Sequence, residues 1–94
     1  MDKMNFDGKV AIVTGAGGSG GIGEAIARRL VAEGAKVVVC DIDEAKARDV
    51  AHALGPNATP WTCDVSRSEQ VDAMVDEAVR AFGRLDVLVN NVGF

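Results

Sequence analysis

The sequence contains no tyrosine, one histidine and one tryptophan, and aromatic residues make up only 4% of its 94 residues. No apolar run approaches the roughly 18–20 residues that a membrane-spanning helix needs, and the first residues lack the basic-then-apolar order of a signal peptide. The net charge is −4 and the ten basic residues are scattered along the chain, so nothing favours a nucleic-acid partner. We therefore expect a cytoplasmic protein with no membrane or nucleic-acid partner.

Cysteine and proline are also rare, with two residues of each. Cys40 and Cys63 lie in apolar stretches and lack the spacing of metal ligands, so we expect two reduced thiols in the core and no metal site. Apolar residue types make up 48% of the chain and charged types 26%, which is an ordinary globular composition. The length predicts one small domain, below the commonest size of roughly 100–150 residues.

Four short apolar runs predict strands, and they cover residues 9–14, 36–40, 58–63 and 85–89. Three of them show little alternation with polar residues, which is typical of strands buried on both faces of a parallel sheet. The run 58–63 contains Pro60, which cannot donate a hydrogen bond to a neighbouring strand. We therefore expect this run at the start of a strand or at an edge of the sheet.

Three amphipathic segments between these runs predict helices over residues 23–33, 43–54 and 66–82. Ser66 followed by Glu69 has the pattern of a capping box, which predicts that the third helix begins at Ser66. Because strands and helices alternate, we expect an α/β fold with a parallel sheet, right-handed crossovers and the strand order 3-2-1-4. Two helices should pack on one face of the sheet and one on the other.

A glycine-rich segment, residues 14–23, connects the first predicted strand directly to the first helix. Glycines let backbone N–H groups approach a pyrophosphate closely, and the helix N-terminus adds unpaired donors and about half a positive charge. A glycine-rich turn alone is weak evidence, but this one has the strand–turn–helix context that dinucleotide binding requires. We expect a dinucleotide here; the alternative is a flexible turn that binds nothing.

Acidic residues follow the second and third predicted strands. Asp41 comes eighteen residues after Gly23, close to the roughly 20 expected for the residue that binds the adenosine ribose. Its carboxylate can accept hydrogen bonds from both ribose hydroxyls and would repel a 2′-phosphate, and no cation follows until Lys46, which favours NAD over NADP. The alternative for Asp41 is a solvated cap of the next helix. Asp64 has two equally open roles, as acceptor of the adenine amino group or as an acid flanking the third helix.

Taken together, these features resemble the short-chain dehydrogenase/reductase family. Its motifs are a Thr-Gly-x-x-x-Gly-x-Gly loop, an acidic residue after the second strand, Asp-Val after the third and Asn-Asn-Ala-Gly after the fourth. The chain matches them from Lys9 to Gly93, with Val92 in place of the alanine. The resemblance implies a single partial Rossmann domain over residues 1–94, truncated relative to the full doubly wound fold. It also implies an oxidoreductase that transfers hydride between NAD(H) and an alcohol or carbonyl substrate.

The resemblance further implies which residues bind the cofactor. The loop would line the pyrophosphate and the nicotinamide side, the two strand-end acids and their neighbours would hold the ribose and adenine, and the fourth turn would approach the adenosine ribose. The residues so assigned are Gly15, Gly17, Ser19, Gly21, Ile22, Gly23, Asp41, Ile42, Asp64, Val65, Asn90 and Gly93. The loop is two residues longer than the family's. Its spacing is recovered by starting from Gly17, with Gly21 and Gly23, but Thr14 then falls two places early, so which glycine takes which role stays open.

The chain lacks the residues that the family uses for acid–base catalysis. In the family a Tyr-x-x-x-Lys pair, a serine and an assisting asparagine follow the fourth strand, whereas this sequence has no tyrosine. A lysine that lowers the pKa of the tyrosine from about 10 is the central device of that chemistry. We therefore expect no catalytic residue among these 94 and no turnover by the chain alone.

Two further hypotheses concern partners and alternatives. The apolar segment 85–89 would leave an open sheet edge, so we expect self-association or completion by another chain there. A non-catalytic dinucleotide-binding or partner-docking module is the main alternative function. An S-adenosylmethionine-dependent methyltransferase shares the loop and the acid after the second strand, but it usually carries an acidic residue just before the loop, where this chain has Val13-Thr14.

Overall fold

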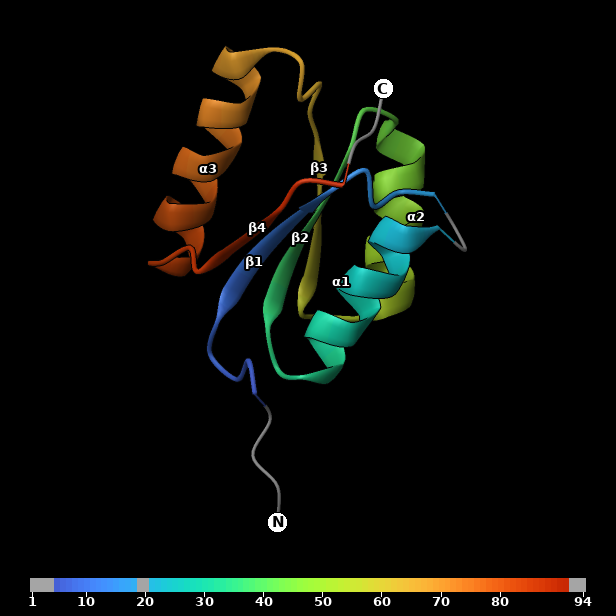
Figure 1. The fold of residues 1–94 in the computed structure, drawn as a ribbon, viewed down its shortest axis with the longest axis vertical. Coiled ribbons are helices and arrows are strands. Elements are labelled where there is room, and N and C mark those ends of the chain that lie inside the picture. The colour runs from blue at the N-terminus through green and yellow to red at the C-terminus, as the bar shows by residue number, and fades with distance from the viewer. Residues whose placement is uncertain (1–4, 19–20, 92–94) are drawn as a thin grey trace.

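The computed structural model describes residues 5–18 and 21–91 (Figure 1). Strands and helices alternate as β1 Val10–Thr14, α1 Ile22–Ala32, β2 Lys36–Asp41, α2 Glu44–Leu54, β3 Ala58–Thr62, α3 Ser68–Phe82 and β4 Val87–Val89. All strand pairs are parallel and the sheet has the order β3-β2-β1-β4. The predicted α/β class and strand order are therefore confirmed.

The sheet separates two layers of helices. Helices α1 and α2 cover one face and α3 covers the other (Figure 1). Because successive strand residues point to opposite faces, Ala11 and Val13 of β1 pack towards α1 and α2 whereas Ile12 packs towards α3. All five residues of β1 are buried, which explains why this strand contains no charged residue.

The two cysteines lie in the core on the α3 side of the sheet. Cys40 and Cys63 are both buried and neither forms a disulfide, as the sequence predicted. Burial raises the pKa of the Cys40 thiol to about 12, with a further contribution from the neighbouring Cys63. Burial also raises the pKa of Cys63. A thiol in this state is a poor nucleophile, so both cysteines act as packing residues.

The predicted capping box at the third helix is wrong. Helix α3 begins at Ser68, and its N-cap residue is Arg67, whose side chain makes no capping hydrogen bond. The hydroxyl of Ser66 instead donates to Oδ1 of Asp64 at 2.6 Å, and its backbone N–H donates to the same oxygen at 3.0 Å. Glu69 accepts from Arg67 at 3.2 Å. The nearby carboxylate of Asp64 therefore outcompetes the helix end for Ser66.

The two outer strands, β3 and β4, are shorter than the predicted ranges 58–63 and 85–89 but occupy the predicted positions in the sheet. Strand β3 forms an edge of the sheet and contains Pro60, opposite Val39 of β2, which confirms the edge position inferred from the proline. Strand β4 has only three residues because Asp86 turns its side chain back onto β1. The carboxylate of Asp86 accepts from the N–H of Val10 at 2.9 Å, and its own N–H donates to the Val10 carbonyl at 2.9 Å.

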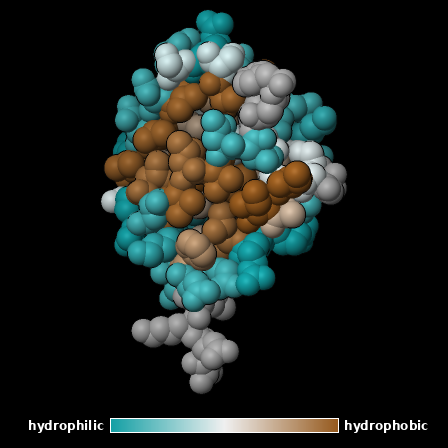
Figure 2. Space-filling model, viewed as in Figure 1, coloured by the Kyte–Doolittle hydropathy of each residue, from teal (hydrophilic) through white to brown (hydrophobic). Residues whose placement is uncertain are grey.

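The β4 edge is apolar and exposed. Leu88 is 50% exposed and Val79 of α3 is 44% exposed. Figure 2 shows apolar side chains gathered on the face of the molecule where Figure 1 places α3 and β4. None of the helices in the part of the chain that the structure describes has the length and hydropathy needed to cross a lipid bilayer.

Candidate functional site

The glycine-rich loop begins with a sharp turn at the end of β1. Gly15 has a φ of +64°, a left-handed conformation that favours glycine because it has no Cβ. The next residue, Ala16, is buried and donates its N–H to the carbonyl of Cys40 at 3.0 Å. The loop therefore leaves β1 and immediately contacts the end of β2.

The second contact between the loop and β2 uses the carboxylate of Asp41. The N–H of Gly17 donates to Oδ2 of Asp41 at 3.0 Å, and the N–H of Asp43 donates to Oδ1 at 2.9 Å. Asp43 in turn is the N-cap of α2, where its side chain accepts from the N–H of Lys46 at 3.1 Å. Asp41 therefore links the loop to the start of α2, and the capping role left open for Asp41 belongs to Asp43.

Gly23 provides the close approach between α1 and the loop. A Cβ at this position would lie 2.5 Å from the carbonyl oxygen of Gly15 and 2.8 Å from Nδ2 of Asn91. No side chain fits there, as expected for the glycine that lets helix and strand pack closely. Gly15 therefore occupies the tight turn and Gly23 the helix contact. Ser19 lies outside the described residues.

Thr14 and the turn after β4 hold the loop from the other side. The Thr14 side chain is buried, and its hydroxyl lies 3.2 Å from Oδ1 of Asn90 and 3.3 Å from the Val89 carbonyl. The same hydroxyl accepts from the N–H of Asn91 at 3.0 Å, and Nδ2 of Asn91 lies 3.5 Å from the Gly15 carbonyl. Sequence reasoning missed the supporting role of Thr14, whereas the Asn91 contact fits the ability of asparagine to bond backbone groups of a neighbouring loop. Gly93 lies outside the described residues.

Asp64 lies at the end of β3, next to the end of β2. The N–H of Cys63 donates to the carbonyl of Asp41 at 3.1 Å. Asp41 and Asp64 therefore lie at the carboxyl ends of two neighbouring strands, β2 and β3. The hydrogen bonds from the side chain and backbone of Ser66 lower the pKa of Asp64. The N–H of Asp64 donates to Oε1 of Gln70 at 2.8 Å. These contacts agree with the role of Asp64 as an acid flanking α3. The other role considered for Asp64, as acceptor of the adenine amino group, stays a prediction.

Two large apolar side chains are exposed beside these polar groups. Ile22 at the start of α1 is 72% exposed and Ile42 after β2 is 68% exposed. An exposed isoleucine is not unusual by itself. Here, Ile22 is the first residue of α1 after the loop, and Ile42 directly follows Asp41, so the role of both in binding a cofactor stays a prediction.

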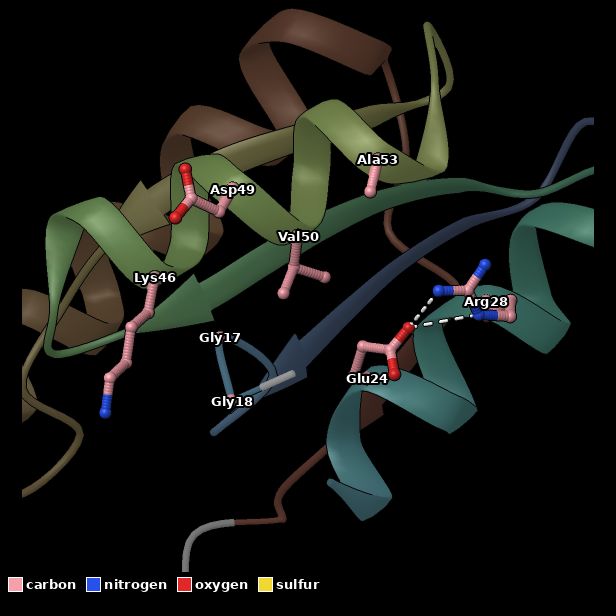
Figure 3. Close-up of a pocket in the computed structure, with 8 residues that line it drawn as sticks. All are labelled: Gly17, Gly18, Glu24, Arg28, Lys46, Asp49, Val50 and Ala53. Carbon is pink, nitrogen blue, oxygen red and sulfur yellow. Dashed lines mark hydrogen bonds and ion pairs between the residues drawn. The ribbon is translucent and has the colours of Figure 1, made fainter. Parts of the chain in front are cut away.

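A pocket of about 380 Å³ opens between the loop, α1 and α2. Figure 3 shows its wall: Lys46 and Asp49 come from α2, and the ion pair of Glu24 and Arg28 comes from α1. Nε of Arg28 donates to Glu24 at 3.0 Å. The loop contributes backbone at Gly17 and Gly18. Sequence reasoning did not identify Glu24, Arg28 or Asp49, because their helical positions indicate only a solvated face.

Comparison with known proteins identifies the family. The family model described as short chain dehydrogenase matches residues 9–94. The chain belongs to the short-chain dehydrogenase family. L-fucose dehydrogenase of Bos taurus is 51% identical over 89 residues, covering 95% of this chain and 32% of that protein. Galactitol 2-dehydrogenase of Agrobacterium fabrum is 46% identical over 88 residues, covering 94% and 34%. The chain spans about a third of the length of these relatives.

Solved structures of family members have the same arrangement. A hydroxysteroid dehydrogenase from Escherichia coli superposes with a TM-score of 0.88 at 40% identity, covering 98% of this chain and 40% of that chain. A 3-ketoacyl-(acyl-carrier-protein) reductase from Brucella melitensis, complexed with NADH, has a TM-score of 0.82 at 44% identity, covering 88% and 33%. The dehydrogenase fold of this chain therefore corresponds to one part of those longer proteins.

Proposed function

We propose that this chain is the NAD-binding N-terminal part of a short-chain oxidoreductase. The contact between Asp41 and the loop carries the proposal, because it brings a carboxylate suited to ribose hydroxyls against backbone suited to a pyrophosphate. The close contacts at Gly17 and Gly23, where a Cβ would meet other atoms within 3 Å, also support it. The NADH in the Brucella melitensis reductase supports a nicotinamide cofactor for the family member described here.

In this proposal the cofactor lies along the carboxyl ends of the strands. Pyrophosphate contacts come from the loop, adenosine contacts come from the ends of β2 and β3, and the turn after β4 supports the ribose. The contributing residues are Gly15, Gly17, Ser19, Gly21, Ile22, Gly23, Asp41, Ile42, Asp64, Val65, Asn90 and Gly93. Bound there, NAD(H) would supply the hydride donor or acceptor for an alcohol or carbonyl substrate.

The proposed preference is for NAD over NADP. A 2′-phosphate would add negative charge beside the Asp41 carboxylate, whereas a 2′-hydroxyl can donate a hydrogen bond to it. Lys46 lines the adjoining pocket, but it stands with Asp49 and Glu24 in that wall, so the nearby charges are mixed. The 2′-hydroxyl form is therefore the better match.

The chain is proposed to bind the cofactor without turning it over. It contains no tyrosine, so the family's acid–base pair would have to come from another polypeptide segment. The β4 edge, with Leu88 half exposed, is the proposed place where such a segment or a second copy packs. We also propose a cytoplasmic location, which the two unpaired cysteines support.

Titration of the chain with NADH and NADPH tests the proposal. NADH is expected to bind, NADPH to bind at least about tenfold more weakly, and Asp41→Ala to narrow this difference. Alcohol oxidation with NAD+ should be undetectable in the same sample. Failure to bind either nucleotide, or turnover by the chain alone at purity confirmed by intact mass, would contradict the proposal.

A further inference from the structure

We infer that Gly17 is a positioning residue that fixes the Asp41 carboxylate and so sets the selectivity for the 2′-position of the cofactor. The inference rests on the proposed dinucleotide function. It assigns to Gly17 a role distinct from the turn at Gly15 and from the helix contact at Gly23. The observation behind it is the direct contact between residues 17 and 41, which lie 24 positions apart in the sequence.

The contact leaves no room for a side chain on Gly17. A Cβ there would lie 2.8 Å from Cβ of Asp41 and 2.9 Å from both its carboxyl carbon and Oδ2. Rotation of the Asp41 side chain would move the carboxylate but not its Cβ. An added methyl group must therefore push the loop away from β2, which would break the 3.0 Å hydrogen bond from the Gly17 N–H.

Backbone conformation does not explain the glycine at position 17. Gly17 is not among the glycines with positive φ, unlike Gly15, so its backbone is open to other residues. Its neighbour Gly18 also lacks a positive φ, and a Cβ at Gly18 would have nothing within 4 Å. The contact with Asp41 therefore distinguishes Gly17 from its neighbour Gly18.

The consequence is a carboxylate held at both oxygens. Oδ2 accepts from the loop at Gly17 and Oδ1 accepts from Asp43 at the start of α2. These two hydrogen bonds hold the carboxylate at a set distance from the loop backbone, and a site ordered by its own contacts has a lower ordering cost of binding. In the proposed function, pyrophosphate recognition by the loop and ribose recognition by Asp41 are therefore coupled through Gly17.

The test compares Gly17→Ala with Gly18→Ala, using NADH and NADPH as the probes. Gly17→Ala is expected to weaken NADH binding about tenfold or more, since it breaks a hydrogen bond to a charged group. NADPH should be affected less, so that the ratio of the two dissociation constants falls. Gly18→Ala should leave the ratio unchanged. Equal losses in both variants, or an unchanged ratio in Gly17→Ala, would overturn the inference.

A double-mutant cycle with Asp41→Gly separates this coupling from a general disturbance of the loop. Asp41→Gly removes the three atoms nearest to the new Cβ, so Gly17→Ala should cost little further in that background. An additive loss would overturn the coupling while leaving the proposed function intact. If the unaltered chain binds neither nucleotide, the proposed function fails and the coupling fails with it.

A measurement without ligand covers the case in which Gly17→Ala does not fold. Hydrogen exchange of the Gly17 amide, followed by NMR, should accelerate about tenfold or more in Asp41→Gly. It should change little in Asp41→Asn, because the amide oxygen of asparagine can still accept. Unchanged exchange in Asp41→Gly would overturn the inference.

Discussion

Strand β1 has two neighbours that are anchored in different ways. Towards β2, five consecutive residue pairs are in register, and the loop adds hydrogen bonds from Ala16 and Gly17 to the end of that strand. Towards β4, three pairs are in register, and the far side of β4 has no further strand within the described residues. The comparison shows that contacts within the chain organise the end of β2 beside the loop, whereas no strand in the described part of the chain pairs with the outer edge of β4.

The largest expected effect is a loss of stability when a side chain is added at Gly23, where the loop packs against α1. Gly23→Ala would place a methyl group 2.5 Å from the Gly15 carbonyl oxygen and 3.0 Å from Cα of Ala16, and loop backbone leaves little room for adjustment. The free energy of unfolding should fall by about 3 kcal/mol, at the upper end of typical overpacking costs. Urea unfolding followed by circular dichroism measures it, with Gly18→Ala as the control. A loss below about 1 kcal/mol would show that the loop adjusts freely.

A smaller effect is expected on self-association when a charge is introduced at the exposed β4 edge. Leu88→Lys should weaken self-association about tenfold, because it removes an exposed apolar side chain of the edge strand and adds a charge. Sedimentation velocity at several concentrations measures the change. Ile42→Lys, at an isoleucine outside β4 that is also exposed, is the control and should leave association unchanged. A strictly monomeric unaltered chain at high concentration would contradict an associating edge.

The smallest effect concerns the acid that ties β4 to β1. The side-chain hydrogen bond from Arg84, followed by that from the Val10 N–H, holds the pKa of Asp86 below its ordinary value. A carboxyl group whose pKa is lowered by folding stabilises the native state above its unfolded pKa, and this contribution is lost as the pH falls through the folded pKa.

Stability should therefore decline more steeply below about pH 4 in the unaltered chain than in Asp86→Asn. Thermal unfolding between pH 7 and pH 2 measures both curves. Parallel curves would show that the Asp86 contacts contribute nothing to stability.

Much of the fold could be predicted from the sequence, because its signals are local and repeated. The run 9–14 shows the apolar, β-branched composition of a doubly buried strand, and Pro60 marks an edge without any knowledge of the neighbours. The glycine-rich segment predicted a turn that could bind a dinucleotide, because it lies directly between a strand and a helix. These features depend on residues close together in the chain.

The features that were not predicted depend either on competition between two groups for one hydrogen bond or on contacts between residues far apart in the sequence. Ser66 has the right position for a cap, but the carboxylate of Asp64 two residues earlier takes its hydrogen bonds. Strand β4 is shorter than its apolar run because Asp86 binds Val10, 76 residues earlier. The contact of Gly17 with Asp41 similarly needs two strands in register before it exists. Sequence spacing predicted that Asp41 follows the loop at the end of the next strand, but it does not show which loop atom Asp41 contacts.

The position of β1 in the middle of the sheet also imposes an order in time. Ala11 pairs with Val37 on one side and with Val87 on the other. On a ribosome that adds roughly 5–20 residues per second, the 76 residues that separate Ala11 from Val87 take about 4–15 s to appear. During that interval one side of β1, four of whose five residues are apolar, has no strand to pair with, so β1 is completed only after β4 has been made.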